Sequence, residues 1–216
     1  MVPYFTIICL VITFLISLSL FSQPKADPYL RLFPYFLFLD LALESLSYYV
    51  SVRVQTNLIV SNPLTVFTFC FYFFILSQIV HNPIAKKVIL YVLFIYPVIA
   101  LFNIYFVLKN ADFHSVTYSI GCLLVVAICI YYFLELFQQT RMVSLLRQPA
   151  FWICSGLLFY SACSFPLYGL NNLVFRNVSY DTIRNLMILF NLLDVFLYSS
   201  FIIAFLCRIR VRKSML

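Results

Sequence analysis

Acidic side chains inside long apolar segments are the residues of this sequence best placed to do chemistry. Asp40 and Glu44 are four positions apart, so a helix would place them on one face. In a second segment Asp194 comes three positions after Asn191 and four before Tyr198, again at helical spacing. Ionisable groups cost about 2.5–3.5 kcal/mol each at the centre of a membrane helix, so they are functional candidates wherever they occur there.

Two interpretations fit these polar stripes. In the first, they line a polar cavity that binds a small ligand or holds a cation or a proton between carboxyl groups. In the second, they are structural, and Asn, Ser, Tyr and protonated carboxyl groups hold the helices together through hydrogen bonds. We predict that Glu44 and Asp194 face a shared interior space and that at least one of them is protonated at pH 7. The candidate ligand- or ion-binding residues are Asp40, Glu44, Asn62, Asn103, Asn191, Asp194 and Tyr198.

The composition predicts the environment of these residues. Of the 216 residues, 64% are hydrophobic and 10% are charged, whereas an ordinary soluble domain has about 25% charged residues. A soluble fold of this size cannot bury so much apolar surface, which excludes a soluble enzyme or binding domain. We therefore predict an all-α, polytopic membrane protein in which residues 1–216 form a single transmembrane domain.

The apolar segments predict a bundle of seven helices. A span across a hydrocarbon core of about 30 Å needs about 20 mainly apolar residues. Seven segments meet this condition, and the connections between them are short. The predicted spans are 4–22, 32–52, 58–80, 88–108, 113–136, 150–170 and 184–207.

The basic residues predict the orientation of the bundle. With the N-terminus outside, the inner segments carry ten Lys and Arg residues and the outer loops carry four. Basic residues concentrate on the cytoplasmic side of membrane proteins, so we expect the N-terminus outside and the C-terminus inside. The net charge of +7 then reflects topology and contact with anionic lipid, and no nucleic-acid partner is expected.

Several kinds of site are absent from the sequence pattern. There is no C-x-x-C motif or Cys/His cluster, so no zinc site is expected. His81 and His114 fall at opposite faces of the membrane and cannot share a haem. Glu135 sits where its span leaves the membrane, within reach of Arg141 or of lipid headgroups. We expect no catalytic residues, no metal site and no cofactor.

One part of the chain has a recognisable pattern. It comprises Tyr131–Leu136 (YYFLEL), the stretch Phe151–Tyr160 (FWICSGLLFY) and Phe201–Cys207 (FIIAFLC). This pattern, Y-x-x-E-L followed by P-x-F-W-I-x-x-G-x-L-x-Y, resembles a group of small uncharacterised bacterial seven-helix integral membrane proteins. The resemblance implies a seven-helix fold in a bacterial cytoplasmic membrane. It also implies a membrane sensor kinase as a partner.

These observations predict a non-enzymatic membrane protein. The leading hypothesis is a sensory or adaptor module that binds a small ligand or a membrane partner and contacts the lipid bilayer. Its signal would leave through helix contacts or through the inner segment 137–149. The first alternative is a small transporter or an ion- or proton-translocating subunit that uses Asp40, Glu44 and Asp194. The second is a membrane-embedded enzyme or assembly subunit without recognisable motifs.

Overall fold

The computed structural model describes residues 3–22, 27–54, 56–109, 112–138, 145–169 and 180–213, and within these residues the chain is helical with no strand. The all-α prediction is confirmed. In this part of the chain there are three short 3-10 turns (η1 Ser19–Ser22, η2 Leu30–Leu32 and η4 Leu145–Arg147) and one π-helical turn, η3 Asn103–Val107. The α-helices are α1 Pro3–Leu18, α2 Phe33–Val54, α3 Leu58–Ile79, α4 Pro83–Phe102, α5 Ser115–Gln138, α6 Pro149–Gly169 and α8 Tyr180–Lys213.

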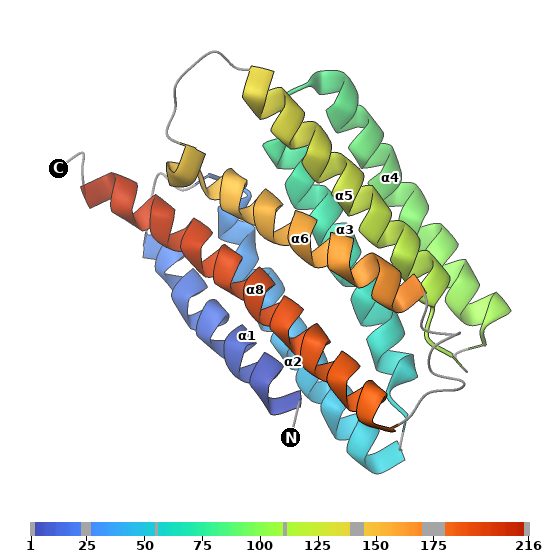
Figure 1. Ribbon diagram of the computed structural model, residues 1–216. Helices are drawn as coiled ribbons and strands as arrows, with labels where there is room; N and C mark the ends of the chain where they lie inside the picture. Colours follow the sequence, from blue (N-terminus) through green and yellow to red (C-terminus); the bar gives the residue numbers. More distant parts are fainter. Residues whose placement is uncertain are drawn as a thin grey trace.

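The helices form a closed ring. Each helix packs against the next one along the chain, and α8 returns to pack against α1 (Figure 1). Contact between α3 and α5 leaves α4 on the outside of the ring. The chain therefore encloses an interior bounded by every α-helix of the described chain except α4.

The surface of the bundle is apolar. Five helical segments are long and apolar enough to cross a membrane: Leu58–Ile79, Pro83–Val107, Ser115–Gln138, Pro149–Gly169 and Asn185–Cys207. The outer face of α4 illustrates this surface, since Ile84, Val88, Tyr91 and Phe94 are all more than half exposed. Large side chains exposed in this way along a helix are stable against lipid. The chain is therefore a multi-pass integral membrane protein.

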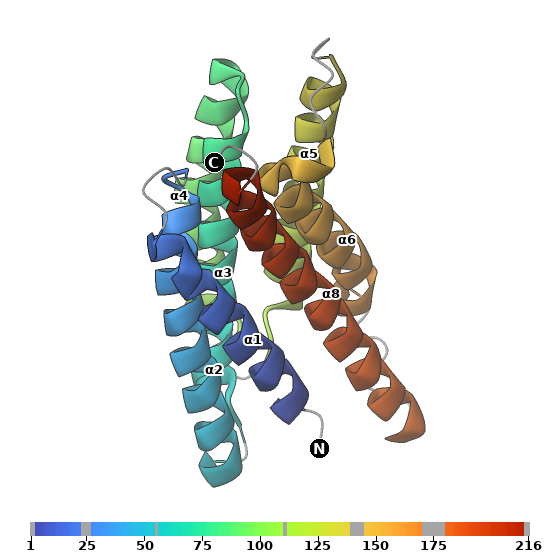
Figure 2. The ribbon, with the colours of Figure 1, turned by 90° about the vertical axis from the view of Figure 1, so that its left-hand side faces the viewer.

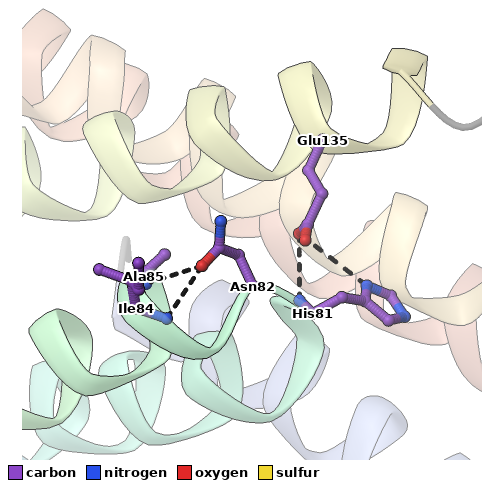
Figure 3. A network of polar contacts seen from close by, with 5 residues as sticks. All are labelled: His81, Asn82, Ile84, Ala85 and Glu135. Carbon is purple, nitrogen blue, oxygen red and sulfur yellow. Dashed lines mark hydrogen bonds and ion pairs between the residues drawn. The ribbon is translucent and has the colours of Figure 1, made fainter.

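One predicted boundary was wrong. The fourth helix begins at Pro83 and not at residue 88, because Asn82 caps it: the Asn82 side-chain oxygen accepts hydrogen bonds from the backbone N–H groups of Ile84 (2.9 Å) and Ala85 (3.4 Å) (Figure 3). An asparagine cap followed by proline at the first helical position is a strong start signal. The last helix runs over 180–213, and its apolar part, Asn185–Cys207, agrees with the predicted span 184–207. The helix continues into the basic end of the chain because Arg and Lys are good helix formers.

Glu135 makes contacts that the sequence did not predict. Its carboxylate accepts a hydrogen bond from the backbone N–H of His81 (3.0 Å) and lies 3.9 Å from the His81 Nδ1 atom (Figure 3). It thereby ties the turn between α3 and α4 to α5. Arg141, the expected ion-pair partner, lies outside the described residues, as do residues 139–144 of the inner segment 137–149.

Aromatic side chains close one half of the ring. The ring of Phe33 on α2 lies 5.3 Å from those of Phe201 and Phe205 on α8 and 5.2 Å from that of Phe71 on α3, with all three pairs edge to face. In the other half α8 diverges from α2, as Figure 2 shows, while α1 stays packed against α8. The first turns of α8 thus lie far from the last turns of α2. The candidate site lies between these two regions.

Candidate functional site

A cavity of about 100 Å³ lies inside the ring. It holds all three carboxyl groups that the sequence analysis singled out on the second and seventh spans, Asp40, Glu44 and Asp194. As predicted, Glu44 and Asp194 face one interior space. The remaining lining residues are Thr6, Leu64, Thr65, Thr68, Phe69, Tyr72, Tyr118, Tyr160, Leu197 and Tyr198, so that α1, α2, α3, α5, α6 and α8 all contribute.

The sequence explains why these side chains point inward. Asp40 and Glu44 are one helical turn apart on α2, and Asp194 and Tyr198 are one turn apart on α8. Each pair therefore lies on a single helix face. On α3 the hydroxyl residues Thr65, Thr68 and Tyr72 follow the same spacing. A lipid-facing position would leave these groups without hydrogen-bond partners, so each stripe turns to the interior.

The three carboxyl groups are only partly satisfied. Asp40 is 6% exposed, and its carboxyl group accepts one long hydrogen bond, from the Tyr198 hydroxyl at 3.5 Å. The Asp194 carboxyl group lies 3.5 Å from the Thr6 hydroxyl and next to Tyr160. Glu44 makes no hydrogen bond to any residue that the structure describes. Each group retains capacity for a further partner.

The carboxyl groups of the cavity can carry negative charge, and no basic group in the described part of the chain balances it. The three carboxyl groups are close enough to one another to repel when ionised. Among the described residues, no Lys, Arg or His side chain lines the cavity to balance them. Such repulsion is strong in a medium of low polarity. The site therefore favours protons or a positively charged occupant over an anion.

The tyrosines supply both rings and hydroxyl groups. The Tyr118 and Tyr160 hydroxyl oxygens are 3.3 Å apart, which links α5 to α6. Tyr72 is 7% exposed, and its hydroxyl makes no hydrogen bond to the described part of the chain. The Tyr72 hydroxyl therefore has capacity for a hydrogen bond to an occupant of the cavity.

Behind the cavity wall, His114 joins α3 to α5. Its Nε2 atom lies 2.6 Å from the hydroxyl of Thr65, and its Nδ1 atom lies 2.8 Å from that of Thr117. His114 precedes the first residue of α5 and is 1% exposed. Burial lowers the pKa of His114 to about 4, so the ring is neutral at pH 7. His114 lies at the end of the span Ser115–Gln138, in agreement with the predicted position at a membrane face, but its contact with Thr65 was not predicted.

The other predicted candidates lie outside the cavity lining. Asn191 accepts the Thr6 hydroxyl at 2.7 Å and donates to the Met187 carbonyl oxygen, so it holds α1 against α8. Asn62 is fully buried and donates to the Asp112 carbonyl oxygen at 3.2 Å. The Asn103 carbonyl oxygen accepts the backbone N–H of Leu108 at 2.9 Å in the π-helical turn.

Six hydroxyl-bearing lining residues were also not predicted from the sequence: Thr6, Thr65, Thr68, Tyr72, Tyr118 and Tyr160. The spacing of Thr65, Thr68 and Tyr72 carried a usable signal, because it repeats the helical period of the acidic stripes. No comparable pattern marked Thr6, Tyr118 or Tyr160.

The cavity does not resemble a metal centre. No three His, Cys, Asp or Glu side chains in the described ranges are placed to hold one metal ion.

No protein-family model matches this chain, and no curated protein or solved structure is significantly similar to it.

Proposed function

We propose that this protein is a non-enzymatic membrane module with seven spans that binds a small ligand in the cavity and acts as a sensor or adaptor. Seven spans require that α1 and α2 also cross the membrane, in addition to the five apolar helical segments. Helix α1 and η1 run without a break from Pro3 to Ser22. Helix α2 has 22 residues, about 33 Å at 1.5 Å per residue, which matches the hydrocarbon core. Its carboxyl groups face the cavity, so they are compatible with a spanning position.

The proposed orientation has the N-terminus outside and the C-terminus inside. Its support is the excess of Lys and Arg in the inner segments, ten against four. The proposed location is a bacterial cytoplasmic membrane, for which the sequence resemblance is the support.

The observation that carries the binding proposal is the origin of the lining residues on six helices. An occupant that contacts these helices together stabilises the one arrangement in which all of them reach it, and so shifts the population of helix arrangements. The buried cluster of Phe33, Phe201 and Phe205 packs just beyond Tyr198, whose ring lies 6.4 Å from that of Phe201. A cavity closed on one side in this way favours binding over passage.

In this proposal another membrane protein binds the bundle and responds to the change in its helix arrangement. A sensor kinase is the partner that the sequence resemblance favours. Contact would be made in the membrane, where α4 presents an apolar face, or through the inner segment 137–149.

Thermal unfolding with fractionated small-molecule extracts tests the binding proposal. A fraction that contains the ligand should stabilise the wild-type protein and the Glu135→Gln control, because Glu135 is a carboxyl residue outside the cavity. The same fraction should have little effect on Glu44→Gln. Equal stabilisation of all three proteins would contradict binding at the cavity.

Ion or proton translocation is the second candidate, since three carboxyl groups without a basic partner are suited to carry a cation. Flux into proteoliposomes separates the two functions. Flux that Glu44→Gln or Asp194→Asn abolishes, but Glu135→Gln leaves intact, would favour transport. No flux above that of empty liposomes would favour the sensor.

A further inference from the structure

We infer that the cavity selects a small primary ammonium, an organic cation with a short apolar chain; this inference rests on the proposed ligand-binding function. Three features of the cavity carry it: the carboxyl groups, the arrangement of aromatic rings and the unpartnered hydroxyl of Tyr72.

The carboxyl groups set the charge of the ligand. Asp40, Glu44 and Asp194 line one small space, and no basic side chain of the described chain lines it with them. A cation between them removes their mutual repulsion, whereas an anion adds to it. A neutral ligand supplies no counter-charge, so the carboxyl groups would have to bind protons in its presence. The ligand is therefore a cation.

The aromatic rings distinguish an organic cation from a metal ion. The ring of Phe69 stands at 82° to that of Tyr72 and at 75° to that of Tyr118, with centroids 6.3 and 5.1 Å apart. Rings set nearly at right angles form adjoining walls, and aromatic faces attract ammonium groups within about 6 Å. The carboxyl groups do not form the compact cluster that a metal ion requires. The same walls can contact an alkyl chain.

The Tyr72 hydroxyl indicates that the ammonium carries N–H groups. It belongs to a lining residue that is 7% exposed, and it has no hydrogen-bond partner among the described residues. A primary ammonium has three N–H donors. These can donate to the Tyr72 oxygen and to two carboxyl groups at once. A quaternary ammonium would leave all of these acceptors unmet.

The size of the cavity limits the ligand. A volume of about 100 Å³ has room for several water molecules. An ammonium group with a chain of two to four carbons is of this order. Propylammonium is a suitable probe, since 1-propanol and propionate are neutral and anionic compounds of similar size.

Isothermal titration calorimetry of the full chain in lipid nanodiscs tests the inference. The titrants are propylammonium chloride, 1-propanol, sodium propionate, tetramethylammonium chloride and sodium chloride. We expect saturable binding of propylammonium alone. Asp194→Asn should weaken it by about tenfold and Tyr72→Phe by about threefold, as expected for lost hydrogen bonds to a charged group. The controls Glu135→Gln and Tyr132→Phe replace residues outside the cavity lining and should bind as the wild type does.

The other outcomes distinguish a failure of the primary-ammonium inference from a failure of the proposed ligand-binding function. Saturable binding of 1-propanol or propionate that needs Asp194 would overturn the choice of cation and leave ligand binding in place. Binding of tetramethylammonium or sodium as strong as that of propylammonium would overturn the primary ammonium. If no titrant binds, the inference fails, and the extract experiment above then decides on ligand binding by itself.

Discussion

The hydroxyl of Thr6 donates a hydrogen bond to the side-chain oxygen of Asn191 over 2.7 Å, which joins the first helix to the last. The same hydroxyl lies 3.5 Å from Asp194. A hydroxyl has only one hydrogen to donate, so the shorter contact takes it. Thr6 therefore closes the ring and leaves the Asp194 carboxyl group available to the cavity.

Replacement of Thr6 by valine should loosen this closure. Thr6→Val keeps the shape of the side chain and removes the hydroxyl, and we expect a loss of about 0.5–1 kcal/mol in stability. Thr13→Val is the matched control, because the Thr13 hydroxyl donates to the Cys9 carbonyl oxygen within α1 and joins no second helix. Thermal unfolding in detergent should rank Thr6→Val as the less stable variant. The reverse order would contradict the role of the contact.

A close approach of α6 to α8 gives a second prediction. A Cβ atom added at Gly156 would come within 2.6 Å of the Ser200 Cβ atom. Gly156→Ala should therefore cost about 1–3 kcal/mol through overpacking. The double variant Gly156→Ala with Ser200→Gly should recover much of this loss, because it moves the Cβ atom from one helix to the other. At Gly169 the nearest atom to an added Cβ lies at 3.5 Å, so Gly169→Ala should cost less than Gly156→Ala in the same unfolding assay.

His114 should make the protein sensitive to acid. Burial lowers its pKa from 6.5 to about 4, so the unfolded chain binds a proton before the folded one does. The stability contributed by the neutral ring is present above pH 6.5 and is lost as the pH falls through about 4. We expect the loss of stability between pH 7.5 and pH 4 to be smaller in His114→Gln than in the wild type. His81→Gln, at a position whose side chain is 70% exposed, should keep the wild-type response. An unchanged response in His114→Gln would contradict the burial argument.

Single cysteines at exposed positions test the topology. In a background without the seven native cysteines, an impermeant thiol reagent added outside intact cells should label cysteine at Thr56 and Asp112. It should label cysteine at Lys87 and Arg147 only after the membrane is opened. All four positions are exposed. The opposite pattern would reverse the orientation.

The helices and the acidic stripes could be predicted from the sequence because both have strong local signals. Long apolar runs marked the spans, and the spacing of Asp40 with Glu44 and of Asp194 with Tyr198 marked the inward faces. The early start of α4 was missed although Asn82 and Pro83 form a recognisable cap, because the boundary was placed from hydropathy and the apolar stretch begins later.

The aromatic part of the cavity could not be predicted in the same way. Tyr91 and Tyr96 belong to one helix, yet Tyr91 is 67% exposed and Tyr96 is 4% exposed. Tyrosine is stable both at a lipid-facing surface and in a core, so its position in the sequence does not say which way it faces. The contact of His114 with Thr65 was missed for a related reason, because these two residues become neighbours only when α3 and α5 pack together.

The central claim is that water and small cations reach the carboxyl-lined cavity. Its most direct test is the rate at which Asp194→Cys, without the seven native cysteines, reacts with 2-aminoethyl and 2-sulfonatoethyl methanethiosulfonate. Asp112→Cys, at an exposed position, gives the reference value for the ratio of the cationic to the anionic reaction rate. Phe94→Cys, on the apolar face of α4, is the lipid-facing control. Because Asp40 and Glu44 remain in the cavity, we expect the cationic reagent to be favoured at position 194 by about tenfold over the reference ratio. We expect no reaction at position 94. A cysteine at 194 that reacts with neither reagent, or equally well with the anionic one, would contradict the account.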